Sequence, residues 1–131
     1  MVLHTCAHNP TGVDLTLDQW KAVAKVCKEK HLYPLFDTAY QGFVSGDLDK
    51  DCEGLRYFLN EGFDMVIAQS FAKNMGLYGE RIGCLHFVCS DKGIADRVLA
   101  HVKIIVRSMI SSPPKHGARV VELILNDPDM R

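Results

Sequence analysis

Apolar residues follow two different patterns along this chain, and each pattern predicts one kind of element. Short apolar runs bounded by turn-forming residues predict strands near residues 2–7, 32–36, 65–69 and 82–88. Apolar residues spaced three and four apart predict helices near residues 17–30, 48–61, 91–109 and 115–125. Strands and helices alternate over the first half of the chain, which favours an α/β fold in which helices cover a sheet.

Residues at the ends of the predicted helices support these boundaries. Thr16 and Gln19 have the spacing of a capping box at the start of the first helix. Asp47 can cap the second helix, and Gly62 is a typical stop after it. Pro34 cannot donate a ladder hydrogen bond, which weakens the prediction of the strand around it. The inward faces of the second and third helices are predicted to carry Leu48, Cys52, Leu55 and Leu59, and Ile94, Val98, Val102 and Ile105, respectively.

Composition indicates a globular domain and excludes several classes of partner. The chain has 131 residues, of which 47% are hydrophobic and 24% charged, enough for one modest domain. A formal net charge of −1 gives no electrostatic footprint for nucleic acid or an anionic membrane. No apolar run approaches the roughly 20 residues of a membrane-spanning helix. The five cysteines are scattered and odd in number, which favours buried thiols in a reducing compartment over a disulfide framework.

Polar residues follow three of the predicted strands, where ligands of α/β sheets bind. Asn9, Asp37 and the segment Ser70–Lys73 each come just after an apolar run, so they can converge on one crevice. Lys73 has Ser70 three residues before it and Arg81 eight residues after it. This arrangement suits an aldehyde cofactor that bears a phosphate. The amine can form a Schiff base, and the hydroxyl and guanidinium can hold the phosphate.

Each of these residues also has an ordinary structural explanation. Asp37 can be a turn or cap aspartate, Tyr40 a half-buried core residue, and Arg107 a solvated cation at a helix end. The run His4-x-Cys6-x-His8 would place three metal ligands on one side of a strand, but no second cluster with zinc spacing accompanies it, so no metal is expected. Ser70-x-x-Lys73 also matches a serine-lysine acylase pattern, whose partner motifs S-D-N and K-T-G do not follow.

Four segments in register resemble one known family. They are His8–Gly12, Asp37–Phe43, Ser70–Gly83 and Ile104–Arg107 followed by Ser112–Pro114. Together they resemble the aspartate aminotransferases, fold-type I enzymes that use pyridoxal phosphate, over essentially the whole chain. The resemblance implies a three-layer α/β/α sandwich with a mostly parallel sheet. It also implies that residues 1–131 are a partial pyridoxal-phosphate-binding large domain, truncated at both ends.

The resemblance implies a role for each residue that would surround the cofactor ring. Lys73 would carry the cofactor as a Schiff base and then act as the catalytic base. Asp37 would hold the pyridine nitrogen protonated, so that the ring accepts electrons. Asn9 and Tyr40 would donate to the phenolic oxygen and stabilise its charged form. Two histidines match positions that help to orient the carboxylate, namely His4 and His8.

The resemblance also implies how the phosphate and the substrate would be held. Ser70 and Arg81 would bind the cofactor phosphate, and Arg81 can do so with two parallel hydrogen bonds. Arg107 would bind the distal carboxylate of a dicarboxylic substrate in the neighbouring subunit of a homodimer. Asn9 would lie beside the substrate as well as the cofactor.

The function implied for the full-length parent is transamination between L-aspartate and 2-oxoglutarate, giving oxaloacetate and L-glutamate. The 131-residue chain alone is expected to be inactive, because the family's arginine for the substrate α-carboxylate, its ring-stacking tryptophan and its upstream phosphate loop fall outside it. Two alternatives stay open: a non-catalytic truncated paralogue or subunit-pairing fragment, and an aromatic amino acid aminotransferase. Free thiols and the family's habits suggest a cytoplasmic location, or the mitochondrial matrix.

Overall fold

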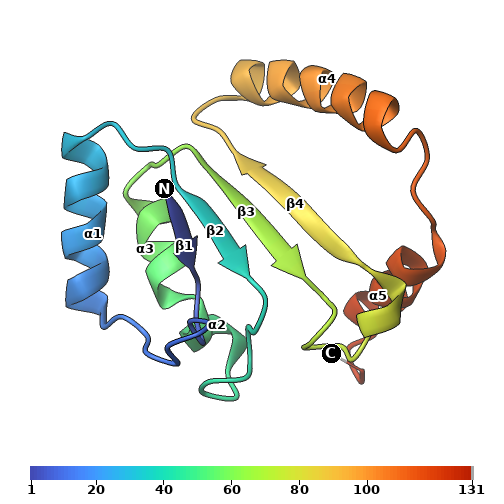
Figure 1. The fold of residues 1–131 in the computed structure, drawn as a ribbon, viewed down its shortest axis with the longest axis horizontal. Coiled ribbons are helices and arrows are strands. Elements are labelled where there is room, and N and C mark those ends of the chain that lie inside the picture. The colour runs from blue at the N-terminus through green and yellow to red at the C-terminus, as the bar shows by residue number, and fades with distance from the viewer. Residues whose placement is uncertain (131) are drawn as a thin grey trace.

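A four-stranded sheet forms the centre of the computed structural model, which describes residues 1–130. The strands lie side by side in chain order: β1 (Val2–His4), β2 (Leu35–Thr38), β3 (Met65–Ser70) and β4 (Gly83–Val88) (Figure 1). The first three run parallel, and β4 runs antiparallel to β3. The helical elements are α1 (Leu17–Glu29), α2 (Leu48–Asp51), α3 (Glu53–Asn60), the 3-10 turn η1 (Tyr78–Glu80), α4 (Lys92–Met109) and α5 (His116–Asn126). The predicted α/β fold with a mostly parallel sheet is confirmed.

An aromatic cluster joins the sheet to the helices that cover one of its faces. Trp20 of α1, Phe36 of β2 and Phe58 of α3 pack with ring centroids 5.2–6.1 Å apart. Trp20 shares the inward face of α1 with Ala24 and Cys27, as the helical spacing predicts. Burying a side chain of this size contributes about 1.5–3 kcal/mol, so the three rings are a main source of the fold's stability.

The predicted helix ends are confirmed by their hydrogen bonds. The amide N–H of Gln19 donates to Thr16 Oγ1 over 3.3 Å, and the Thr16 N–H donates to Gln19 Oε1 over 2.8 Å. The Asp47 carboxylate accepts from the first amides of α2. Gly62 follows α3 with φ +75°, a left-handed conformation that suits glycine.

Two predicted strand boundaries were wrong, for reasons in the local hydrogen bonding. The first strand ends at His4 rather than Ala7, because the amides of Ala7 and His8 donate to the Asp14 carboxylate instead of continuing the ladder. The second begins after Pro34 and extends to Thr38. Asp37 therefore lies inside β2 rather than just beyond it.

The single helix predicted over residues 48–61 is two helices with a break at Cys52, where ψ is 18°. The break turns the inward face, so Gly54 and Phe58 are buried while Leu48 and Leu59 are about half exposed. The predicted inward face is therefore only half right. Cys52 is buried and Leu55 packs against the core, but Leu48 and Leu59 do not belong to it.

The C-terminal helices bury less than their sequence suggests. On α4, which crosses the top of Figure 1, Ile94, Val98 and Val102 are half-buried as predicted, but Ile105 is 53% exposed. None of the α4 residues, all of which the structure describes, is fully buried. Among residues 1–130 no helix is long and apolar enough to cross a membrane. Three of the cysteines are buried, as predicted, whereas Cys84 is exposed and Cys89 is intermediate.

Candidate active site

Two adjoining cavities lie where the parallel strands β1, β2 and β3 end. The smaller, of about 90 Å³, is lined by His4, Cys6, Asn9, Asp37, Ala39, Tyr40 and Lys73. The larger, of about 260 Å³, is lined by Asp37, Ala68, Gln69, Ser70, Ala72, Arg81, Ile82 and Gly83. Asp37 lines both, so residues from distant parts of the sequence meet around one carboxylate.

Strand register explains why Asp37 is central. It pairs with His4 of β1 on one side and with Ala68 of β3 on the other. The small side chain of Ala68 leaves the space beside the carboxylate open. Thr38, the next residue along, points to the opposite face, where its hydroxyl lies 2.5 Å from that of Thr5 in a buried pair. The Asp37 side chain is half-buried and faces the cavities.

Lys73 and Tyr40 meet across the smaller cavity. The Lys73 Nζ atom lies 5.2 Å from the centroid of the Tyr40 ring, within the range of a cation–π contact. The Tyr40 ring packs edge-on against Phe43, with centroids 6.4 Å apart. An amine and a phenol therefore lie side by side next to the carboxylate of Asp37.

Ser70 and Arg81 lie on the larger cavity because β4 runs back along β3. Ser70 pairs with Gly83 in the antiparallel ladder, and the Phe71 N–H donates to the Ile82 carbonyl over 3.1 Å. Arg81 is in a left-handed conformation with φ 49°, and its Nη1 donates to the Tyr78 carbonyl over 3.1 Å. The guanidinium is exposed and has further donors available, so a hydroxyl and a cation share one edge of the sheet.

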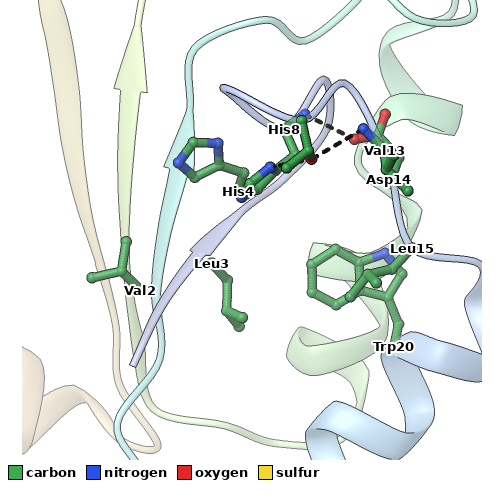
Figure 2. A pocket seen from close by; sticks show the side chains of 9 residues that line it. Val2, Leu3, His4, His8, Val13, Asp14, Leu15 and Trp20 are labelled. Atoms are coloured by element: carbon green, nitrogen blue, oxygen red, sulfur yellow. Dashed lines mark hydrogen bonds between the residues drawn. The ribbon is translucent and has the colours of Figure 1, made fainter.

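Asn9 and His4 form the N-terminal wall of the smaller cavity, whereas His8 lies outside it and lines a neighbouring pocket. The Asn9 amide N–H donates to His4 Nδ1 over 3.2 Å, and the His4 and His8 rings lie 4.7 Å apart. His4 also lines a separate pocket of about 420 Å³ that extends to Asp14 and Trp20 (Figure 2). The imidazole of His4 therefore stands between that pocket and the candidate site.

Arg107 is not brought to this site. It lies in the last turn of α4, is exposed, and its Nη1 donates to the Ser111 hydroxyl. It lies outside both cavities as the described residues define them.

A metal centre gains no support from the His4-x-Cys6-x-His8 run. Because β1 ends at His4, the three side chains do not share one strand face. Burial, together with the negative charge of Asp51, raises the pKa of the Cys6 thiol to about 11, which keeps it protonated at neutral pH. Within residues 1–130 no group of three or more His, Cys, Asp or Glu side chains is placed to hold a metal.

Several lining residues were not identified from the sequence. Ala39 and Gln69 line the cavities through their place at strand ends, and no spacing signal marks them. Cys6 was considered only as a metal ligand, not as a residue of this cavity. Gly83 is different, because a Cβ atom there would lie 2.5 Å from the Gln69 carbonyl oxygen. The close approach of β4 to β3 at the site therefore needs glycine.

Comparison with known proteins decides the family. The family model described as aminotransferase class I and II matches residues 1–131. The chain belongs to this family. It is 53% identical to the mitochondrial aspartate aminotransferase of Gallus gallus, over 100% of the chain and 31% of that protein. It is 52% identical to the cytoplasmic aspartate aminotransferase of Oryza sativa subsp. japonica, over 99% of the chain and 32% of that protein.

Solved structures confirm the aminotransferase fold. The aspartate aminotransferase of Trypanosoma cruzi has a TM-score of 0.94 and 47% identity, covering 99% of this chain and 33% of that one. The aromatic-amino-acid aminotransferase of Burkholderia pseudomallei, covalently bound to pyridoxal phosphate, has a TM-score of 0.96 and 42% identity, covering 99% and 32%. The chain thus spans about a third of the length of these aminotransferases.

Proposed function

We propose that this chain is the cofactor-binding part of an aspartate aminotransferase that uses pyridoxal phosphate. The reaction of the whole protein is amino-group transfer between L-aspartate and 2-oxoglutarate, which gives oxaloacetate and L-glutamate. The observation that carries the proposal is the meeting of Lys73, Tyr40 and Asp37 around one cavity, adjoining a second cavity that Ser70 and Arg81 line.

The donors present fit pyridoxal phosphate group by group. The cofactor carries an aldehyde, a phenolic oxygen, a pyridine nitrogen and a phosphate, and when bound it supplies an electron sink for the substrate Cα. In the same order, the chain offers an amine for the aldehyde, a phenol and an amide for the phenolic oxygen, a carboxylate for the pyridine nitrogen, and a hydroxyl and a guanidinium for the phosphate. The larger cavity is lined in part by residues with little or no side chain, namely Ala68, Ala72 and Gly83, which leaves room for a flat ring against the backbone.

Each side chain then has a defined task toward that group. The Asp37 carboxylate holds a proton at the pyridine nitrogen, and the Tyr40 hydroxyl and Asn9 amide donate to the phenolic oxygen. Ser70 donates to the phosphate, and Arg81 neutralises it with paired N–H groups. The Lys73 amine would hold the cofactor through its aldehyde and, once free, would move the proton at the substrate Cα.

Substrate choice is assigned to Arg107. A guanidinium favours a dicarboxylic substrate, because it can bind the distal carboxylate with two hydrogen bonds. The family resemblance implies that Arg107 acts in the site of the other subunit of a homodimer, and its exposed position at the end of α4, outside the cavities, is compatible with that role. The relatives named as aspartate aminotransferases support the preference for a dicarboxylic substrate. The aromatic aminotransferases among the solved structures make that activity the second candidate.

We infer that the 131-residue chain does not turn over by itself. It spans about a third of its relatives, and Arg107 is not positioned at its own cavities. As a domain, residues 1–131 are then a partial large domain, and a non-catalytic product that pairs with a longer subunit is the alternative. The relatives include mitochondrial and cytoplasmic proteins, and we propose the cytoplasm, with the mitochondrial matrix second.

Pyridoxal phosphate titration of the purified chain tests the site. A near-visible absorbance band is expected on addition of the cofactor, and borohydride reduction followed by peptide mapping should place the adduct on Lys73. Lys73→Ala should lose the band, whereas Lys25→Ala, a change at an exposed lysine of α1, should keep it. An adduct spread over several surface lysines, or a band unchanged in Lys73→Ala, would contradict the proposal.

An activity assay separates the binding site from the inactive-chain inference. With aspartate and 2-oxoglutarate the chain should show no turnover, although it binds the cofactor. A rate in the ordinary range of about 1–10³ per second would overturn the inference.

A further inference from the structure

The loop that follows β2 is organised around one buried carboxylate. Asp51, at the end of α2, is 7% exposed. Its Oδ2 accepts hydrogen bonds from the amides of Gly42 (2.8 Å) and Val44 (3.0 Å). Its Oδ1 accepts from the amide of Ser45 (3.0 Å) and from the Ser45 hydroxyl (2.5 Å). Four donors from one loop therefore converge on a single side chain.

These donors compensate for the burial of the charge. Burial by itself raises the pKa of Asp51, but the Ser45 hydroxyl and the amides of Val44, Gly42 and Ser45 outweigh it, and the pKa lies below its ordinary value. Hydrogen bonds to an ionised acceptor are stronger than those between neutral groups. Asp51 is thus ionised at neutral pH and holds the loop in one conformation.

The loop held by Asp51 determines where Tyr40 lies. The Phe43 N–H donates to the Tyr40 carbonyl over 3.0 Å, and the Phe43 ring packs against the Tyr40 ring. The two amides bound to Oδ2 belong to the residues on either side of Phe43. Fixing Gly42 and Val44 therefore fixes Phe43, and Phe43 supports the Tyr40 ring beside Lys73.

A second set of bonds ties the same loop to the sheet. Gln41 Nε2 donates to the Leu48 carbonyl over 2.9 Å, and Gln69 Nε2 on β3 donates to Gln41 Oε1 over 3.3 Å. The loop is therefore bonded from α2 and from β3. Asp51 lies outside both site cavities as the described residues line them, so it reaches the site through the loop and through its charge, which also acts on Cys6.

We propose that Asp51 is a positioning residue, which aims the Tyr40 hydroxyl at the cofactor and thereby sets the proton affinity of the bound cofactor. This inference rests on the proposed function, because it assigns Tyr40 to the phenolic oxygen of pyridoxal phosphate. A hydroxyl held at that oxygen stabilises its charged form, so a displaced Tyr40 makes the bound cofactor retain its proton to higher pH.

The variant Asp51→Asn tests the inference with little change in shape. Asparagine has one acceptor oxygen, so it must abandon either the pair of amides at Gly42 and Val44 or the two Ser45 donors. Amide hydrogen exchange without cofactor should accelerate over residues 42–45. The pH midpoint of the visible absorbance change of bound pyridoxal phosphate should rise by about 1 unit, the scale of one hydrogen bond to a charged oxygen.

Two further variants separate positioning from stability. Asp49→Asn alters an exposed carboxylate in the same short helix, which pairs with Arg56, and should leave the midpoint unchanged. By itself, Tyr40→Phe should raise the pH midpoint of the absorbance change. Adding Asp51→Asn to that variant should raise the midpoint no further. Such non-additivity is expected only when one residue acts through the other.

The outcomes are distinct. A chain that forms no visible band with pyridoxal phosphate overturns the proposed function, and the inference with it. A normal band whose midpoint is the same in Asp51→Asn overturns the inference alone, even if the variant unfolds more easily. Additive shifts in the double variant overturn it too. If Asp51→Asn does not fold by circular dichroism, Ser45→Ala is the substitute variant. It keeps the three amide bonds to Asp51 and removes the Ser45 hydroxyl, with its bonds to Asp51 and Asp47. It should raise the midpoint by a smaller amount, and an unchanged midpoint there also overturns the inference.

Discussion

Replacing Gly83 by alanine should loosen the junction of β3 and β4 at the candidate site. A Cβ atom on Gly83 would lie 2.5 Å from the Gln69 carbonyl oxygen, and 3.6 Å from the Ser70 Cα. Because the obstacle is backbone, the two strands must separate locally. Overpacking of this kind costs about 1–3 kcal/mol. The reduced freedom of the unfolded chain returns about 0.4–1 kcal/mol, so we expect a net loss of about 1–2 kcal/mol.

Urea unfolding measures this loss. With a slope of about 2 kcal/mol per molar urea, the midpoint should fall by roughly 0.5–1 M. The affinity for pyridoxal phosphate should fall as well, since Ser70 and Arg81 are held by the same junction. Gly79→Ala is the matched control, because no atom lies within 4 Å of the Cβ it would add. If Gly83→Ala were as stable as Gly79→Ala, the argument from close strand approach would be refuted.

Three further changes have defined outcomes. Phe58→Ala removes a side chain with 0% exposure from the aromatic cluster and should cost about 3–5 kcal/mol in urea unfolding, far more than Leu59→Ala next to it, which is 48% exposed. The pKa of Asp51 is below its ordinary 3.8 in the folded chain, so the ionised carboxylate stabilises the fold at neutral pH, and this stabilisation should be lost as the pH falls below about 4. Urea unfolding measured across pH should show this loss in the unchanged chain but not in Asp51→Asn. Arg107→Ala should leave the visible band of the 131-residue chain with pyridoxal phosphate intact, and a lost band would show that Arg107 reaches the cavities.

Local patterns predicted the elements well where burial and capping agree. The first helix was predicted to within one residue at its C-terminal end, because Thr16 caps it and Trp20, Ala24 and Cys27 recur on one face. The break at Cys52 could not be predicted from spacing. It depends on Asp51 turning toward amides of the preceding loop, a contact that only the folded chain creates.

The candidate site was predicted in composition better than in detail. Asn9, Asp37 and Lys73 were expected to converge because polar residues follow neighbouring strands, and they line one cavity. Tyr40, which only the family resemblance implied, lines the same cavity. Their assigned roles stay predictions. The place of Asp37 within β2, and the direction of β4, depend on long-range pairing that an apolar run does not encode.

The reversed direction of β4 gives the segment between Ser70 and Arg81 a particular property. This segment leaves the sheet and returns to it at the same edge, and the Phe71–Ile82 hydrogen bond already closes its base. An anion bound by both Ser70 and Arg81 would connect the two ends of this segment, which the sheet already holds close together. Little conformational freedom of the chain is therefore lost when the anion binds. Pyridoxal without its phosphate would make neither contact, so the chain should bind it with much lower affinity than it binds pyridoxal phosphate.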